Sequence, residues 1–208
     1  MMLRKAKLIF LIVMHWSAHA FRLYTLWSSI YRFIYHRKYK HVVLSLGLDP
    51  DQATELMDTL TWKKDGLKEL GDAVGSPYWV QHCIDSIAET GSQPDGSLDC
   101  DDFSAWAVNC INPNFEPLYF TTSWLTLEGK PSGHAVCLFF RGRNPKKLYH
   151  TGNWGIRGPF KSLPELSKKM IAAAGGHEPI GWSLYTYDME LIDFGKGIPP
   201  EYNLIDRP

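Results

Sequence analysis

Cysteine is scarce in this chain, because four cysteines in 208 residues are too few for a disulfide scaffold. The sequence also lacks repeats of fixed period and low-complexity segments, which excludes solenoids, collagens and coiled coils. Metal-binding motifs of the CxxC or HExxH type are missing as well, and this disfavours a zinc enzyme. What is present is 45% hydrophobic and 21% charged. That composition predicts a globular chain with one medium domain and a tail, or at most two small domains.

Acidic residues are missing from the N-terminal part of the chain. Residues 1–48 contain eight Lys or Arg and no Asp or Glu, so the remainder contains 14 basic and 22 acidic side chains. The net charge of zero therefore combines a basic N-terminal part, called the head, with an acidic remainder, called the body. We divide the chain into a basic, aromatic helical segment (1–41) and a second domain (42–208). We expect the head to contact something that the body does not, either a membrane surface or a nucleic acid.

Long hydrophobic runs are also missing, since the apolar stretch 8–14 is short. It fits a signal peptide with a cleavage site at Ala18–Ala20. It also fits a transmembrane helix over about residues 8–27, although two histidines and Arg22 interrupt that span. The other interpretations are a helix lying on a membrane or nucleic-acid surface and a helix packed on its own domain. A retained helix favours a cytoplasmic or peripheral membrane location over secretion.

Caps and periodicity predict helices first and strands afterwards. Asp49 and Gln52 have the spacing of a capping box around Pro50, and Ser76 before Pro77 predicts a second helix start. The expected helices cover 49–60, 76–89, 99–111 and 163–174, and the expected strands cover 118–127, 134–140, 147–151 and 182–194. Helices followed by a mostly antiparallel sheet define an α+β fold.

Three residues form a candidate catalytic set. Cys100 lies at a predicted helix N-terminus, where the helix dipole and free backbone N–H groups favour the reactive thiolate. His134 opens a predicted strand, and Asn153 follows the next strand, so an antiparallel pair would bring them together. A thiol, a base and a group that orients the base are the parts that thiol catalysis needs. Each residue also has an ordinary structural interpretation, and only their order and context favour chemistry.

The segment around Cys100 resembles a known family. Leu98–Ala107 (LDCDDFSAWA) resembles the D-C-[DE]-D-[FY] segment of transglutaminase-like cysteine peptidases, which include bacterial transglutaminase-like cysteine proteinases and phage-encoded relatives. Upstream, Trp62–Asp65 and Ser76-Pro77 look like the W-x-x-D and S-P elements that commonly precede that segment. Downstream, Gly133–Cys137 is similar to the G-H-A-V strand of the family. The resemblance covers about residues 60–155.

The resemblance implies a papain-like core, with Cys100 on a helix N-terminus packed against a mostly antiparallel sheet that carries His134. It also implies thiol-dependent acyl transfer on a protein or peptide amide, either hydrolysis or cross-linking, without a cofactor. Many relatives use Asp as the third residue. This chain offers Asn153, the residue type that papain-like enzymes use, with His150 as the alternative. A catalytically silent domain of the same fold, acting as a binding or structural module, is the competing interpretation.

Two further expectations concern the surroundings of the thiol. The backbone N–H of Cys100 would be one oxyanion donor, and Gln93 or Trp79 would supply a second and contact substrate. Some relatives bind calcium through acidic residues beside the cysteine. The acidic residues here could do so or could cap the helix, and we expect no metal; they are Asp99, Asp101 and Asp102.

Overall fold

The computed structural model describes residues 2–20, 30, 33–34, 37–63, 76–96, 98–142 and 147–201. Its helices are α1 (Met2–Ala20), α3 (Pro50–Asp58), α4 (Pro77–Thr90), α5 (Cys100–Cys110) and α6 (Leu163–Ala173), with a short 3₁₀ helix at Pro113–Phe115. Its strands are β1 (Leu118–Thr126), β2 (Pro131–Arg141), β3 (Lys147–Thr151), β4 (Arg157–Phe160), β5 (Gly176–Tyr185) and β6 (Leu191–Lys196).

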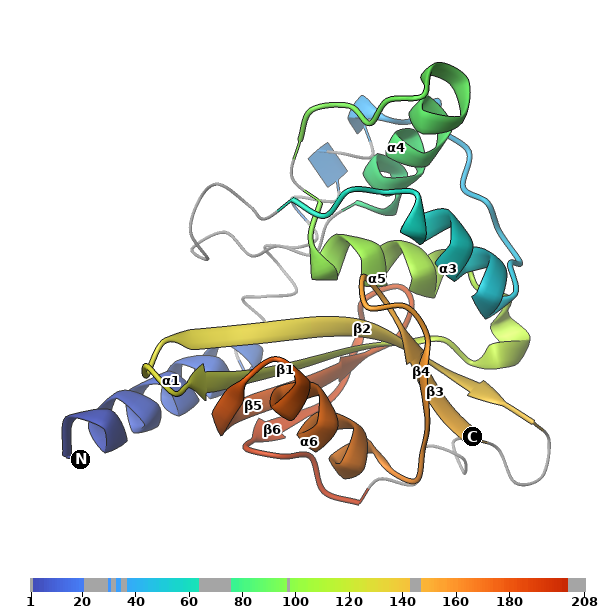
Figure 1. Cartoon of the computed structure of the whole chain (residues 1–208). Coiled ribbons are helices and arrows are strands. Elements are labelled where there is room, and N and C mark those ends of the chain that lie inside the picture. Colours follow the sequence, from blue (N-terminus) through green and yellow to red (C-terminus); the bar gives the residue numbers. More distant parts are fainter. Residues whose placement is uncertain are drawn as a thin grey trace.

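The strands form an antiparallel sheet in the order β4-β3-β2-β1-β5-β6 (Figure 1). Short connections join neighbouring strands, except that β4 is followed by α6 and the chain then returns to pair β5 with β1. Helices of the first half of the chain and this sheet confirm the predicted α+β class.

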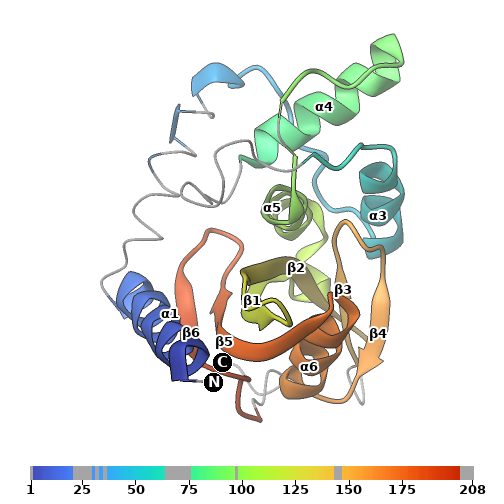
Figure 2. The same cartoon turned by 60° about the vertical axis from the view of Figure 1, so that its left-hand side comes forward.

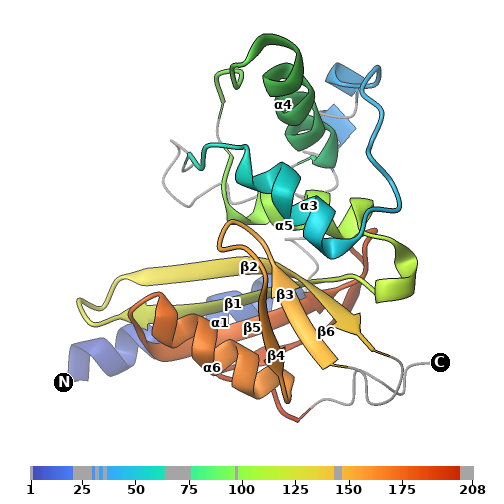
Figure 3. The same cartoon turned by 45° about the vertical axis from the view of Figure 1, so that its right-hand side comes forward.

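Alternation along the strands gives the sheet two buried faces. Tyr119 and Cys137 belong to a core with α3, α4 and α5, whereas Phe120 and Val136 belong to a second core under α6. Figures 1 and 3 show α3, α4 and α5 on one side of the sheet and α6 on the other. A side chain of β1, β2 or β3 can therefore be assigned to a helical layer from its position in the alternation.

Capping boxes confirm two of the predicted helix starts. The carboxylate of Asp49 accepts a hydrogen bond from the N–H of Asp51 at 2.9 Å, and Gln52 reaches back to the N–H of Asp49 at 3.0 Å. Asp99 and Asp102 form the same box at the start of α5. Ser76 precedes α4 as expected, but its hydroxyl is buried and makes no cap hydrogen bond with a described residue. Pro77 at the first helical position requires no amide partner, so α4 begins there without a side-chain cap.

The C-terminal half contains two strands more than expected. The strand predicted at 182–194 is two strands, because a turn returns the chain: Thr186 N–H donates to Glu190 O at 2.9 Å, and Met189 has a φ of +68°. The alternation of apolar residues continues across this turn, so periodicity alone did not separate β5 from β6. The short strand β4 was not predicted, because Gly158 and Pro159 lie within it and weaken the strand pattern.

The N-terminal helix α1 packs against β5 and β6, at the edge of the molecule in Figure 2. The Nε2 atom of His15 lies 3.3 Å from the carbonyl oxygen of Trp182, and its ring covers Gly181. Among the described residues no helix has the length and apolar content needed to cross a bilayer. The transmembrane continuation to about residue 27, and part of the W-x-x-D element at Trp62–Asp65, lie outside the described residues. The division at residue 41 stays a prediction.

Candidate active site

Cys100 is the first residue of α5 and is only half-buried. The capping box at Asp99 holds the preceding backbone in an extended conformation and starts the helix at the thiol-bearing residue. The hydroxyl of Ser104, one turn further, donates to the carbonyl oxygen of Cys100 at 2.6 Å. A thiol in this position is exposed to the positive end of the helix dipole, which favours its ionised form.

The other three cysteines are buried and free of disulfides. Burial raises the pKa of Cys83 and of Cys110 to about 12, and it raises the pKa of Cys137 further still. Desolvation disfavours the thiolate, so these thiols stay protonated at neutral pH. Only Cys100 combines exposure with a helix N-terminus, as the sequence predicted.

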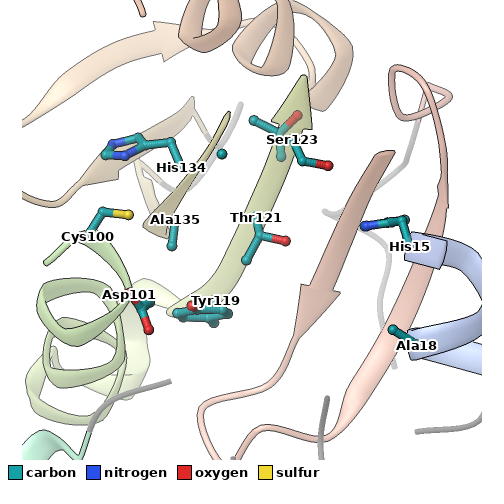
Figure 4. A pocket seen from close by; sticks show the side chains of 11 residues that line it. His15, Ala18, Cys100, Asp101, Tyr119, Thr121, Ser123, His134 and Ala135 are labelled. Carbon is teal, nitrogen blue, oxygen red and sulfur yellow. The ribbon is translucent and has the colours of Figure 1, made fainter. Parts of the chain in front are cut away.

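A pocket of about 250 Å³ opens beside Cys100. Its floor is the face of β1 and β2 that carries Thr121, Ser123 and Ala135, and Asp101 lies next to Cys100 in its wall. Figure 4 shows Cys100 and His134 on one side of this pocket, with His15 and Ala18 of α1 across β1 from them. The structure therefore brings the predicted nucleophile and the predicted base to one pocket.

His134 is buried, and its ring stacks on Trp154 with centroids 3.7 Å apart. The alternation of β2 assigns its side chain to the α6 side, since it pairs with Thr122, whose hydroxyl lies 3.3 Å from that of Ser167 on α6. Its Nε2 atom has no hydrogen-bond partner among the described residues. Burial lowers the pKa of His134 to about 3, with a smaller effect from His150, so the imidazole is neutral at physiological pH.

Asn153 lies in the turn that follows β3, and its Oδ1 atom is buried without a partner among the described residues. The hydrogen bond expected from His134 to Asn153 is therefore not formed in this conformation. Pairing of β2 with β3 ends at Cys137 and Thr151, so the turn leaves the sheet before it reaches His134. Continuing that register sets Trp154, not Asn153, opposite His134, which explains the observed stacking.

The alternative third residue, His150, lies elsewhere. It pairs with Leu138 in the middle of β2, stacks on Phe160 and does not line the pocket. Burial lowers its pKa to about 4, with a smaller contribution from Arg157. His150 is a core histidine of the α6 layer.

The acidic residues beside Cys100 are buried, and two of them cap the helix. Ligand atoms of Asp99, Cys100 and Asp101 lie within 4.8 Å of one another, but Asp99 and Asp102 are engaged by the backbone N–H groups of the capping box. Burial and neighbouring carboxylates hold the pKa of Asp101 well above its usual range. The raised pKa of Asp101 disfavours a negative charge beside Cys100, and such a charge would oppose the thiolate.

Neither candidate for the second oxyanion donor lines this pocket, and the expected substrate contacts stay a prediction. Trp79 is buried in the core of the α3–α5 layer, where its ring packs on Tyr39 and covers Gly96. Gln93 uses both ends of its amide to bind the backbone of Thr61, at 2.7 and 3.1 Å. Local sequence could not reveal these contacts, because both partners are distant along the chain.

Sequence reasoning missed the contribution of α1 and β1 to the pocket. His15 and Ala18 line it from α1, and the hydroxyls of Thr121 and Ser123 lie in its floor, held by Ser183 and by the carbonyl of Gly181. Thr121, Thr122 and Ser123 are consecutive in the sequence, and the two-residue period of a strand places Thr121 and Ser123 on one face. The packing of α1 on β5 and β6 had no comparable signal.

No protein family model matches this chain, and neither a curated protein nor a solved structure is significantly similar to it.

Proposed function

We propose that this protein is a cysteine peptidase, amidase or transglutaminase-like acyltransferase that acts on a protein or peptide amide. The observation that carries the proposal is the position of Cys100, a half-buried thiol at a capped helix N-terminus, on a pocket that His134 also lines. The other three cysteines are buried structural thiols. A single thiol selected by exposure and helix position is the arrangement that covalent catalysis uses.

In the proposed mechanism the Cys100 thiolate attacks the carbonyl carbon of the amide, and His134 takes the thiol proton and passes it to the leaving amine. The N–H of Cys100, at the start of α5, donates to the developing oxyanion. The acyl-enzyme is then released to water or to an amine. No cofactor is required by this chemistry.

Proton transfer from Cys100 and the role of Asn153 both depend on a shift of the His134 ring, because the alternation of β2 assigns that ring to the α6 side of the sheet. The resting ring is neutral, which is the form that accepts a proton, but its low pKa makes it a weak base. Its Nε2 and the Oδ1 of Asn153 both lack hydrogen-bond partners among the described residues, and they are complementary as donor and acceptor. A bond between them would satisfy two buried atoms and raise the basicity of the ring.

We infer a papain-like core for the same reasons. The helix that carries Cys100 precedes the sheet in the chain and packs on β2, the strand of His134. Strand β3, which leads to the turn with Asn153, is the neighbour of β2. These features agree with the resemblance of residues 60–155 to transglutaminase-like cysteine peptidases.

A catalytically silent domain is the second candidate, and the stacking of His134 on Trp154 favours it. In that case the pocket would bind a partner without reacting, and Cys100 would behave as an ordinary half-exposed thiol. The two candidates differ in the reactivity of Cys100 below its usual pKa of about 8.5.

Thiol alkylation against pH tests the proposal. We expect iodoacetamide to label Cys100 selectively below pH 7, as located by mass spectrometry, and Cys100→Ala to abolish that label. We expect His134→Gln to slow the labelling at pH 7 by about tenfold or more, in line with a lost base.

His150→Gln is the matched control, because His150 is equally buried on the neighbouring strand but does not line the pocket. It should leave the rate of labelling unchanged. Labelling of Cys100 with a thiol-like pH profile that His134→Gln does not alter would refute the catalytic pair and leave the silent domain.

A further inference from the structure

Helix α1 has an exposed apolar face that no described residue covers. The side chains on it are 53–62% exposed; they are Ile9, Phe10, Val13, Met14 and Trp16. The opposite face contributes His15 and Ala18 to the pocket and contacts β5 and β6. Exposure of this many large apolar side chains on one helix is unusual for a surface that faces only water.

These positions form one continuous stripe when projected at about 100° per residue. The exposed lysines Lys5 and Lys7 fall on its two edges, and the ammonium group of Lys7 donates to the carbonyl oxygen of Gly129 at 2.6 Å. Lysine side chains at the margins of an apolar face can extend their ammonium groups toward lipid phosphates while the face itself is buried. Trp16 adds the aromatic residue that prefers the boundary between headgroups and acyl chains.

The charge distribution sets the orientation. The first 48 residues contain eight basic side chains and no acidic one, and all eight lie in the head. The rest of the chain has more acidic than basic side chains. An anionic surface would attract the head and repel the body. Figure 2 shows α1 at the periphery beside β6, and the exposed side chains of its outward face are not covered by any described residue.

We propose that α1 docks this protein on an anionic phospholipid bilayer, lying in the plane of the interface with the Ile9–Trp16 face inserted. Lipid is favoured over nucleic acid because the centre of the face is apolar, whereas phosphate backbones are bound through cationic and polar groups. It is favoured over a second copy because two such faces would bring four flanking lysines, Lys5 and Lys7 of each chain, together.

Vesicle co-sedimentation of the full chain tests the proposal. We expect binding to phosphatidylcholine vesicles that contain about 30% phosphatidylglycerol, and weaker binding to pure phosphatidylcholine or at high salt. The double variant Phe10→Glu with Val13→Glu should lower the binding constant by at least about tenfold, since it inserts two charges into the apolar face. Lys5→Gln should weaken binding less and reduce its salt dependence.

The control is Val43→Glu with Tyr187→Glu, which changes two residues of comparable or greater exposure outside α1 and should bind as the wild type does. Four results would overturn the proposal. They are absence of vesicle binding by the wild type, equal binding by the double variant, binding only to a DNA or RNA duplex, and dimerisation in light scattering that the double variant abolishes. The wild-type measurement decides the matter even if a variant fails to fold.

Discussion

Cys100 owes its position to a single local device, the capping box of Asp99 and Asp102. The Asp99 carboxylate accepts from the N–H of Asp101 at 3.3 Å, and Asp102 accepts from the N–H of Asp99 at 3.1 Å. The same device starts α3 at Asp49, far from the pocket. The box at Asp49 is therefore an internal comparison for the effect of the Asp99 box on the Cys100 thiol.

We predict that Asp99→Ala lowers the free energy of unfolding by about 1 kcal/mol, the usual value of an N-cap, as measured by urea denaturation. It should also change the alkylation rate of Cys100, because the first turn of α5 loses its fixed geometry. Asp49→Ala should cost a similar stability and leave that rate alone. Equal effects of both variants on alkylation would mean that global stability, not the local box, controls the thiol.

At the scale of elements, α1 is part of the candidate site and not an appendage. It supplies His15 and Ala18 to the wall opposite Cys100 (Figure 4), and the ring of His15 covers Gly181 of β5. A side chain enlarged at Ala18 would therefore reduce the space in the pocket without touching Cys100.

We predict that Ala18→Trp slows labelling of Cys100 by a bulky maleimide about tenfold, which corresponds to a steric barrier of about 1.4 kcal/mol. Labelling by the small iodoacetamide should change little. Val13→Trp, on the outward face of the same helix, is the matched control and should affect neither reagent. A uniform slowing of both reagents by Ala18→Trp would indicate a displaced helix and not a filled pocket.

At the scale of the whole molecule, two buried histidines in the α6 layer couple stability to pH. Burial lowers the pKa of His134 to about 3 and that of His150 to about 4, from 6.5 in the unfolded chain. Between these values the unfolded state binds more protons than the folded state, so stability rises with pH. The contribution is complete above pH 6.5 and is lost progressively as the pH falls toward 3–4.

We predict that acidification from pH 7 to 4.5 lowers the free energy of unfolding by on the order of 2 kcal/mol for each histidine. Urea denaturation at several pH values measures it. His134→Gln and His150→Gln should each flatten this dependence, and replacement of the exposed His177 should not. An unchanged slope in both buried variants would contradict the assigned burial.

The parts that local sequence could predict are those whose causes are local. The capping box at Asp49 and the start of the helix at Cys100 rest on contacts within four residues, so pattern reasoning found them. The capping role of Asp99 was left open beside calcium binding. The same reasoning merged β5 with β6, because a turn of five residues left the apolar pattern uninterrupted. It also gave Trp79 and Gln93 to the site, although their contacts with Gly96 and Thr61 lie elsewhere.

By itself the sequence determined the α+β class, the basic head and the choice of Cys100 as the thiol at a helix start. Only the tertiary structure decided which side chains share the pocket, because that depends on strand register and on contacts between distant residues. The register of β2 with β3 places Trp154 beside His134 and leaves Asn153 without its expected bond. The packing of α1 on β5 and β6 turns one face of the basic head into a pocket wall and leaves the other exposed.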